Sequence, residues 1–260
     1  MNAFGELQSL RERPLPAPAQ QETRAHIAID IDGKHNAEPL VAAKDFGIRG
    51  ENFYATARNP PYYFVVPGAT EALLVRRSVG EYLAQVSQRL AAADLELYLF
   101  DAWRPQAVQR FFHDSWVPRE LRQRRPDLSD AEIAAETGQY WAAPTKDASA
   151  PAPHSTGGAV DLSIRWRNGG DFLWMGSLFD DASAISHVRH FEVLAGGDAF
   201  SFSAEEARAN RRLLYWLMIE AGFASNSSEW WHYSFGDRMW AQSTGHPTLL
   251  YAGIEAPPAP

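Results

Sequence analysis

The sequence predicts a single α+β domain. Strand signals and helix signals are mixed along its 260 residues without a regular β-α-β rhythm. Neither a Gly-x-Gly-x-x-Gly run nor a Gly-Lys-Ser/Thr phosphate loop is present, which disfavours a doubly wound nucleotide-binding fold. No strong linker divides the middle of the chain, so we expect one domain.

Five segments carry the alternation or the aromatic and β-branched content typical of strands. They are residues 26–31, 62–66, 95–100, 159–166 and 230–235. In residues 159–166, side chains at positions 160, 162 and 164 share one face, so Asp161 points to the other face with Ala159 and Ser163. These two small neighbours leave room for a ligand to approach Asp161.

Helix starts are marked by three capping boxes, in which a serine precedes a glutamate by three residues. The serines are Ser78, Ser129 and Ser203. The second helix is expected to end near residue 136, and the third to end at Gly222, which suits the position after a C-cap. A further helix is expected over residues 106–113.

Both ends of the chain are polar and rich in proline. We therefore expect a flexible arm over residues 1–24, one domain over residues 25–252 and a tail over residues 253–260. Residues 142–153 are expected to form a loop.

Composition excludes several classes of function. A formal net charge of −8, with no basic run, disfavours binding to nucleic acid. The absence of cysteine excludes disulfides and thiolate metal sites, so any zinc must use His, Asp or Glu. No apolar run approaches the ~20 residues of a membrane span, and the first residues lack the pattern of a secretory signal. We expect a soluble, cytoplasmic protein, although this composition is also compatible with the periplasm.

Two short motifs carry groups that could bind a metal. His154 lies in a glycine-containing turn, and Asp161 follows seven residues later in a predicted strand. Glu229 and His232 lie in the run SEWWHY, which follows the polar residues 225–228 and therefore begins on a loop. Each motif alone is also compatible with an ordinary loop histidine, a solvated carboxylate or a tryptophan-rich core.

Taken together, the two motifs supply the parts of a catalytic zinc site. Such a site takes three protein ligands and leaves a fourth position for water, which becomes a nucleophile near neutral pH. A nearby carboxylate can take the proton of that water and pass it to the leaving amine. We expect His154, Asp161 and His232 to be the ligands and Glu229, with its longer side chain, to be the base.

A third motif, Asp101-Ala-Trp-Arg-Pro105, follows a predicted strand. Arg104 would project there from a fixed backbone, where a guanidinium can stabilise a carbonyl oxygen that becomes an oxyanion. The alternative is a surface salt bridge between Arg104 and Asp101.

These three motifs resemble the zinc D-Ala-D-Ala dipeptidases of the VanX type, within the group of D,D-carboxypeptidases and dipeptidases that share a fold with the hedgehog signalling domain. The resemblance runs from about residue 45 to residue 240. It implies a central antiparallel sheet flanked by helices, one Zn²⁺ per chain on His154, Asp161 and His232, Glu229 as general base, and Arg104 on the substrate carbonyl. It also implies that Asp180, in the segment Met175–Asp180, binds the ammonium of a small dipeptide substrate.

The sequence departs from the family pattern at two positions. Ala152 stands where the family has a serine, and Trp103 where it has a tyrosine. The upstream tyrosine that lines the substrate site in the family has no clear equivalent near Asn52 and Phe53.

Three alternatives are weighed beside a dipeptidase. The first is a D,D-carboxypeptidase or another small-peptide hydrolase. The second is a non-catalytic zinc-binding module, which the presence of Glu229 and Arg104 disfavours. The third is a tryptophan-lined sugar binder, which leaves His154 and Asp161 without a function. His187 and His190 could in principle bind metal, but core or surface roles are favoured because no partner carboxylate is evident. The sequence leaves the oligomeric state open.

Overall fold

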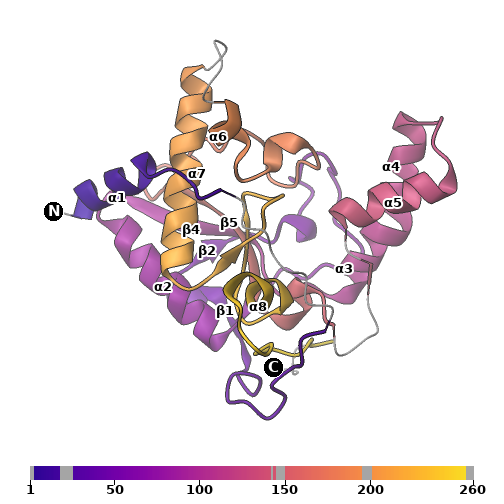
Figure 1. Cartoon of the computed structure of the whole chain (residues 1–260), viewed down its shortest axis with the longest axis horizontal. Coiled ribbons are helices and arrows are strands. Elements are labelled where there is room, and N and C mark those ends of the chain that lie inside the picture. The colour runs from indigo at the N-terminus through magenta and orange to yellow at the C-terminus, as the bar shows by residue number, and fades with distance from the viewer. Residues whose placement is uncertain (1–2, 18–25, 142, 145–149, 195–200, 256–260) are drawn as a thin grey trace.

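The computed structural model describes residues 3–17, 26–141, 143–144, 150–194 and 201–255. Its centre is a five-stranded sheet (Figure 1) with the order β2 (Arg49–Gly50), β4 (Leu95–Asp101), β5 (Ala159–Trp166), β7 (His232–Ser234) and β6 (Ala224–Ser225). Neighbouring strands are antiparallel, except that β2 and β4 are parallel. A separate antiparallel pair joins β1 (Leu40–Ala42) to β3 (Leu74–Arg76). The predicted α+β class is confirmed.

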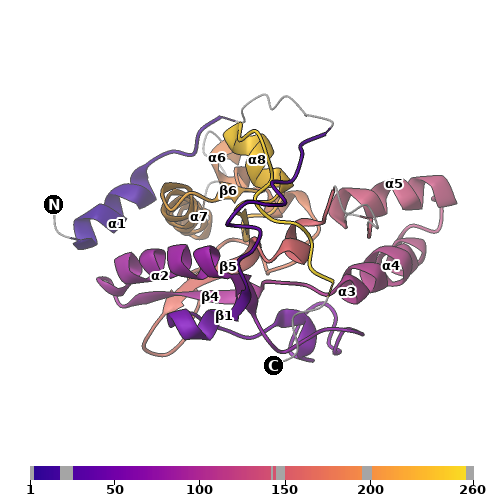
Figure 2. The same cartoon turned by 90° about the horizontal axis from the view of Figure 1, so that it is seen from below.

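Helices surround the central sheet (Figures 1 and 2). They are α1 (Ala3–Glu12), α2 (Arg77–Ala91), α3 (Gln106–Phe111), α4 (Val117–Arg124), α5 (Asp130–Tyr140), α6 (His190–Leu194), α7 (Phe202–Glu220) and α8 (Arg238–Thr244). Short 3₁₀ helices are η1 (Ala43–Phe46), η2 (Phe53–Ala55), η4 (Pro153–Thr156) and η5 (Ala184–Ser186), and a π-helical turn, η3 (Phe112–Trp116), joins α3 to α4. Helices α4 and α5 project away from the sheet (Figure 1).

The main core joins the sheet to α2 and α7. It contains apolar side chains of β4, β5, α2 and α7 that are at most 1% exposed, namely Leu97, Leu99, Val160, Leu162, Ile164, Leu83, Leu90, Leu214 and Leu217. Each such side chain contributes about 1.5–3 kcal/mol by burial. Because these residues alternate along β5, Asp161 and Ser163 point to the opposite face, as predicted.

Three of the five predicted strands are confirmed, since residues 95–100 and 159–166 lie in β4 and β5, and residues 230–235 contain β7. The strand predicted over residues 26–31 is wrong, because Ile29 makes only an isolated bridge to Leu249. The strand predicted over residues 62–66 is also wrong, since Tyr62 lies in a turn, Phe64 in a bend and the other three residues in irregular structure. Tyr63 has a φ of 59°, which breaks an extended run.

One of the three predicted capping boxes is confirmed: Ser129 caps α5 together with Glu132, although the helix runs to Tyr140. The box at Ser78 is wrong, because its N–H and Oγ donate to Glu38 at 2.8 and 2.6 Å and α2 begins at Arg77. Helix α7 begins two residues earlier than predicted, because Ser201 accepts from the N–H of Ala204 at 3.2 Å. The helix predicted over residues 106–113 ends at Phe111, and the π-helical turn η3 follows it.

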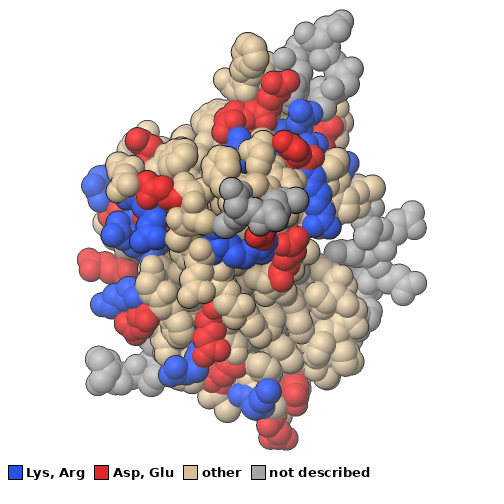
Figure 3. Space-filling model, turned by 90° about the vertical axis from the view of Figure 1, so that its left-hand side faces the viewer, with Lys and Arg blue, Asp and Glu red and all other residues tan. Residues whose placement is uncertain are grey.

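The N-terminal segment corrects the expectation of a flexible arm. Residues 3–12 form α1, which packs across α7 and buries Leu7 and Leu10. Ion pairs join Arg11 to Glu206 at 2.9 Å and Arg13 to Glu220 at 3.0 Å. Acidic and basic side chains are intermixed over the side of the molecule drawn in Figure 3. Leu7 and Leu10 lie three residues apart and therefore on one face of the helix. This spacing indicates an amphipathic helix, but the polar and proline-rich composition of the segment makes it hard to recognise.

Part of the predicted domain division falls outside the described residues. This applies to residues 18–25 of the arm and 256–260 of the tail, and to much of the loop predicted over 142–153. The range 25–252 for the domain stays a prediction.

Substitution of Leu10, which is 6% exposed, tests the docking of α1. We expect Leu10→Ala to lower the free energy of unfolding by about 2–4 kcal/mol, because it removes apolar contacts and leaves a cavity against the core. Chemical denaturation measures the change, with the exposed Gln8→Ala as control. Equal stability of the two variants would show that α1 does not contribute to the fold.

Candidate metal centre and active site

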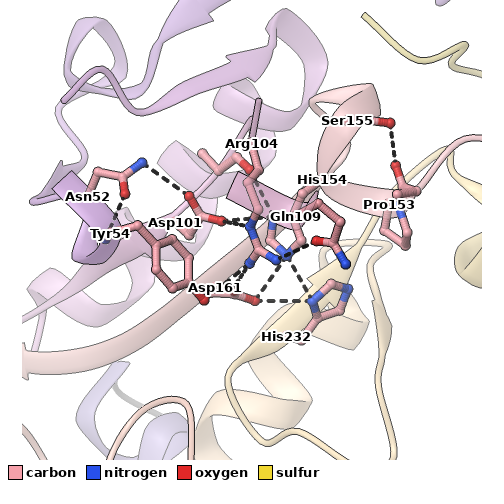
Figure 4. Close-up of polar contacts among 12 residues, drawn as sticks. Asn52, Tyr54, Asp101, Arg104, Gln109, Pro153, His154, Ser155, Asp161 and His232 are labelled. Carbon is pink, nitrogen blue, oxygen red and sulfur yellow. Dashed lines mark hydrogen bonds and ion pairs between the residues drawn. The ribbon is translucent and has the colours of Figure 1, made fainter. Parts of the chain in front are cut away.

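Three predicted residues meet at one buried point (Figure 4). Asp161 of β5 and His232 of β7 are register partners, so their side chains lie side by side on one face of the sheet. His154 comes from η4, and Gly157 ends that turn with a φ of 73°, which lets the chain enter β5. Their side chains each offer one ligand atom, and these atoms all lie within 4.8 Å of one another.

The donor atoms fit a tetrahedral zinc site. Asp161 Oδ1 lies 3.4 Å from His154 Nε2 and 3.1 Å from His232 Nδ1, and the two ring nitrogens are 3.1 Å apart. Ligands ~2.0–2.1 Å from a tetrahedral zinc are about 3.3 Å from one another. The triad therefore has the ligand types and the spacing that zinc requires.

Neighbouring groups orient both imidazoles. His154 Nδ1 lies 2.8 Å from the carbonyl oxygen of Ala102, which can only accept, so Nδ1 donates and Nε2 keeps its lone pair for a metal. His232 Nε2 lies 3.1 Å from Ser234 Oγ. Burial alone would raise the pKa of Asp161, but His154 and His232 hold it well below its ordinary range. Asp161 is therefore a carboxylate that is ready to bind a cation.

Glu229 lies beside the triad, on the turn that leads into β7. Its Oε2 is 3.8 Å from His232 Nδ1 and accepts from Asn226 Nδ2 at 2.9 Å. Burial raises the pKa of this carboxyl group. The side chain keeps 28% of its surface accessible and faces the cavity. A carboxylate with an elevated pKa at this position is suited to accept and return a proton.

The ion pair between Arg104 and Asp101 is present, but both residues are buried, so only the surface location of that alternative is wrong. Arg104 Nε donates to Asp101 Oδ2 at 2.7 Å, and its Nη2 lies 3.2 Å from Asp161 Oδ2. Gln109 Oε1 accepts from Nη1 at 3.2 Å. Burial alone would lower the pKa of Arg104, but Tyr54, Asp101 and Asp161 raise it, so the guanidinium stays charged.

Asp180 faces the same cavity from the loop after residue 175. Its Oδ2 accepts from the hydroxyls of Tyr54 at 3.0 Å and Tyr62 at 2.6 Å. Burial raises the pKa of Asp180 to about 7. Tyr54 and Tyr62 were not identified from the sequence; Tyr54 follows the poorly matching Asn52 and Phe53, and Tyr62 was placed in a strand.

The loop that carries Asp180 is held by a buried arginine, Arg211 of α7, which is 2% exposed. Its guanidinium donates to the carbonyl oxygens of Met175 at 2.7 Å, Ile185 at 2.8 Å and His187 at 2.7 Å. These hydrogen bonds satisfy the buried cation and fix both ends of the loop.

One cavity of about 220 Å³ collects these groups. The triad, Glu229, Arg104, Asp180 and Tyr54 line it, together with Ala152 and Trp231. Trp230 instead packs in the core and donates from Nε1 to Ser177 Oγ at 2.8 Å. His187 and His190 are not part of this triad. Among the helices of the described residues, none is long and apolar enough to cross a membrane.

Three residues that could hold a metal ion, beside a carboxylate and a buried guanidinium, are the arrangement expected of a metal-dependent hydrolase. Comparison with known families is more specific. The family described as D-Ala-D-Ala dipeptidase, Peptidase_M15, matches residues 42–247, and the chain belongs to this family.

Several curated relatives are D-alanyl-D-alanine dipeptidases. The chain is 34% identical over 182 residues to the protein of Synechocystis sp., covering 64% of this chain and 73% of the relative. It is 32% identical over 203 residues to that of Streptomyces coelicolor, covering 72% and 86%. Identity to the protein of Enterococcus faecium is 29% over 206 residues, covering 76% and 90%.

Solved structures with weaker similarity include VanYB in complex with D-Alanine-D-Alanine. It shares 16% sequence identity at a TM-score of 0.39, covering 74% of this chain and 91% of the other.

Proposed function

We propose that the chain is a zinc-dependent dipeptidase that hydrolyses D-Ala-D-Ala. The observation that carries the proposal is the convergence of His154, Asp161 and His232 with Glu229, Arg104 and Asp180 in one cavity. Membership of the family supports the same substrate. The cytoplasmic location expected from the sequence stays a prediction.

His154 Nε2, Asp161 Oδ1 and His232 Nδ1 would hold the zinc. When bound there, zinc lowers the pKa of a water ligand to ~7 and polarises a carbonyl group. Glu229 would take the proton of the attacking water and deliver it to the nitrogen of the leaving D-alanine. Asn226 donates to this carboxylate at 2.9 Å and would limit its movement during both transfers.

Arg104 would bind the substrate carbonyl oxygen and stabilise the negative charge that develops on it. Its hydrogen bonds to Asp101 and Gln109 hold the guanidinium in place before substrate arrives. Asp180, supported by two tyrosine hydroxyls, would bind the free ammonium at the other end of the dipeptide.

A panel of alanine dipeptides tests the proposal. We expect zinc-loaded protein to release alanine from D-Ala-D-Ala at least ~100-fold faster than from L-Ala-L-Ala, and to lose activity with a chelator. Zinc binding without hydrolysis of any dipeptide would instead indicate a non-catalytic zinc module.

His154→Ala tests the metal site. We expect zinc affinity to fall by more than ~100-fold, because loss of a ligand costs more than loss of an outer hydrogen-bond partner, which alone costs ~10–100-fold. Elemental analysis after dialysis measures bound zinc, with His113→Ala as the matched control outside the cavity. Full zinc occupancy in His154→Ala would exclude this histidine as a ligand.

Glu229→Gln separates the base from the ligands. We expect kcat to fall ~10²–10⁴-fold, since the amide cannot accept the proton, while zinc content stays unchanged. The exposed Glu205→Gln is the control for kinetics and metal analysis. A metal-free Glu229→Gln variant would mean that Glu229 is itself a ligand.

A further inference from the structure

The turn that carries His154 is held by a segment outside the family match. That match covers residues 42–247, whereas the segment comprises residues 251–254. The N–H of Ile254 donates to the carbonyl oxygen of Ser155 in η4 at 2.8 Å. Ser155 follows His154 directly in the chain, so this hydrogen bond restrains the turn on which the metal centre depends.

The same segment also contacts the turn that carries Arg104. Trp103 Nε1 donates to the carbonyl oxygen of Ile254 at 3.0 Å. Trp103 is 3% exposed, and it is one of the two positions at which the sequence departs from the family pattern. The backbone of Ile254 therefore joins the residue after His154 to the residue before Arg104.

The two turns also contact each other directly. The N–H of Arg104 donates to the carbonyl oxygen of His154 at 3.2 Å, and His154 Nδ1 donates to that of Ala102 at 2.8 Å. Ile254 adds a third connection between them. Trp103 and Ile254 lie outside the lining of the active-site cavity, so they act on it only through the turns that they connect.

The connecting segment is anchored by a buried cation, Arg76 of β3, which is 3% exposed. Its Nη2 donates to the carbonyl oxygen of Ala252 at 3.0 Å, and its Nε donates to that of Thr156 in η4 at 2.8 Å. The guanidinium also lies 4.9 Å from the ring centre of Tyr251. The N–H of Ala252 donates to Asn36 Oδ1 at 2.8 Å. These contacts satisfy the buried cation and hold the segment against η4.

Building on the proposed function, we propose that Trp103 and residues 251–254 form a positioning element of the active site. They set the placement of η4, and with it His154, relative to the guanidinium of Arg104. A metal ligand and a group that stabilises charge must keep a fixed separation, since a displacement of ~1 Å can lower a rate by ~10²-fold. A turn that is already held in place also loses less conformational entropy when zinc binds.

Trp103→Phe tests one half of this connection, because it removes the N–H donor and keeps an aromatic ring. We expect the dissociation constant for zinc to rise about tenfold, the lower end of the effect of losing an outer hydrogen-bond partner. Competition with a chromogenic chelator measures this constant without any need for turnover.

Trp216→Phe is the matched control for the indole. Trp216 Nε1 donates to the carbonyl oxygen of Arg13 at 3.0 Å, so the control loses the same kind of hydrogen bond away from the cavity lining. We expect its zinc affinity to equal that of the unaltered chain. Equal zinc affinity in Trp103→Phe and Trp216→Phe would overturn the inference.

Ile254→Pro tests the other half, since proline has no N–H to donate to Ser155. Ile254→Ala shortens the same side chain and keeps the N–H, so the comparison isolates the hydrogen bond. We expect Ile254→Pro to bind zinc about tenfold more weakly than Ile254→Ala. If Ile254→Pro is less stable to denaturant and yet binds zinc as tightly as Ile254→Ala, the segment is purely structural and the inference fails.

Kinetics on D-Ala-D-Ala separate this inference from the proposed function. At saturating zinc, we expect Trp103→Phe and Ile254→Pro to lower kcat about tenfold and to change KM less, because Asp180 lies on another loop. An active unaltered chain with kcat unchanged in both variants would overturn the inference and leave the proposed function intact. Weakened zinc binding in both variants of a chain that hydrolyses no dipeptide would support the positioning of η4 and overturn the proposed function.

Discussion

The buried carboxylate of Asp161 is the constraint on which the rest of the site depends. A charge that is 98% removed from solvent is costly unless several partners satisfy it. Its partners come from three separate parts of the chain: Arg104 after β4, His154 in η4 and His232 in β7. Satisfying one carboxylate thus fixes the strand end, the 3₁₀ turn and the neighbouring strand relative to one another.

The same region carries more negative than positive charge. Asp101, Asp161, Asp180 and Glu229 lie at or next to the cavity, and Arg104 is the permanent cation that pairs with two of them. A divalent cation at the triad would offset this excess, and it would also use the imidazole lone pairs that the hydrogen bond to Ala102 leaves free. Zinc binding at the triad would therefore also stabilise the folded site.

The sequence predicts the chemistry of the site better than its walls. His154, Asp161, Glu229 and His232 could be found because each pair is close in sequence and the two pairs together supply the parts of a catalytic zinc site. Tyr54 and Tyr62 could not, because they reach Asp180 only through tertiary packing, from segments more than 100 residues away. Local signals also failed where a distant group competed with them: Glu38 takes the hydrogen bonds of Ser78 that a capping box would have used. The apolar face of α1 was hidden by its polar surroundings.

The position of Asp180 on the boundary between the active-site cavity and a second cavity of about 450 Å³ has a consequence for inhibitor design. A compound that joins a zinc-binding group to an amine through a linker passing Asp180 would occupy both cavities at once. Once the first group is bound, the second binds at the high effective concentration that the linker sets, so affinity rises without any improvement in either contact.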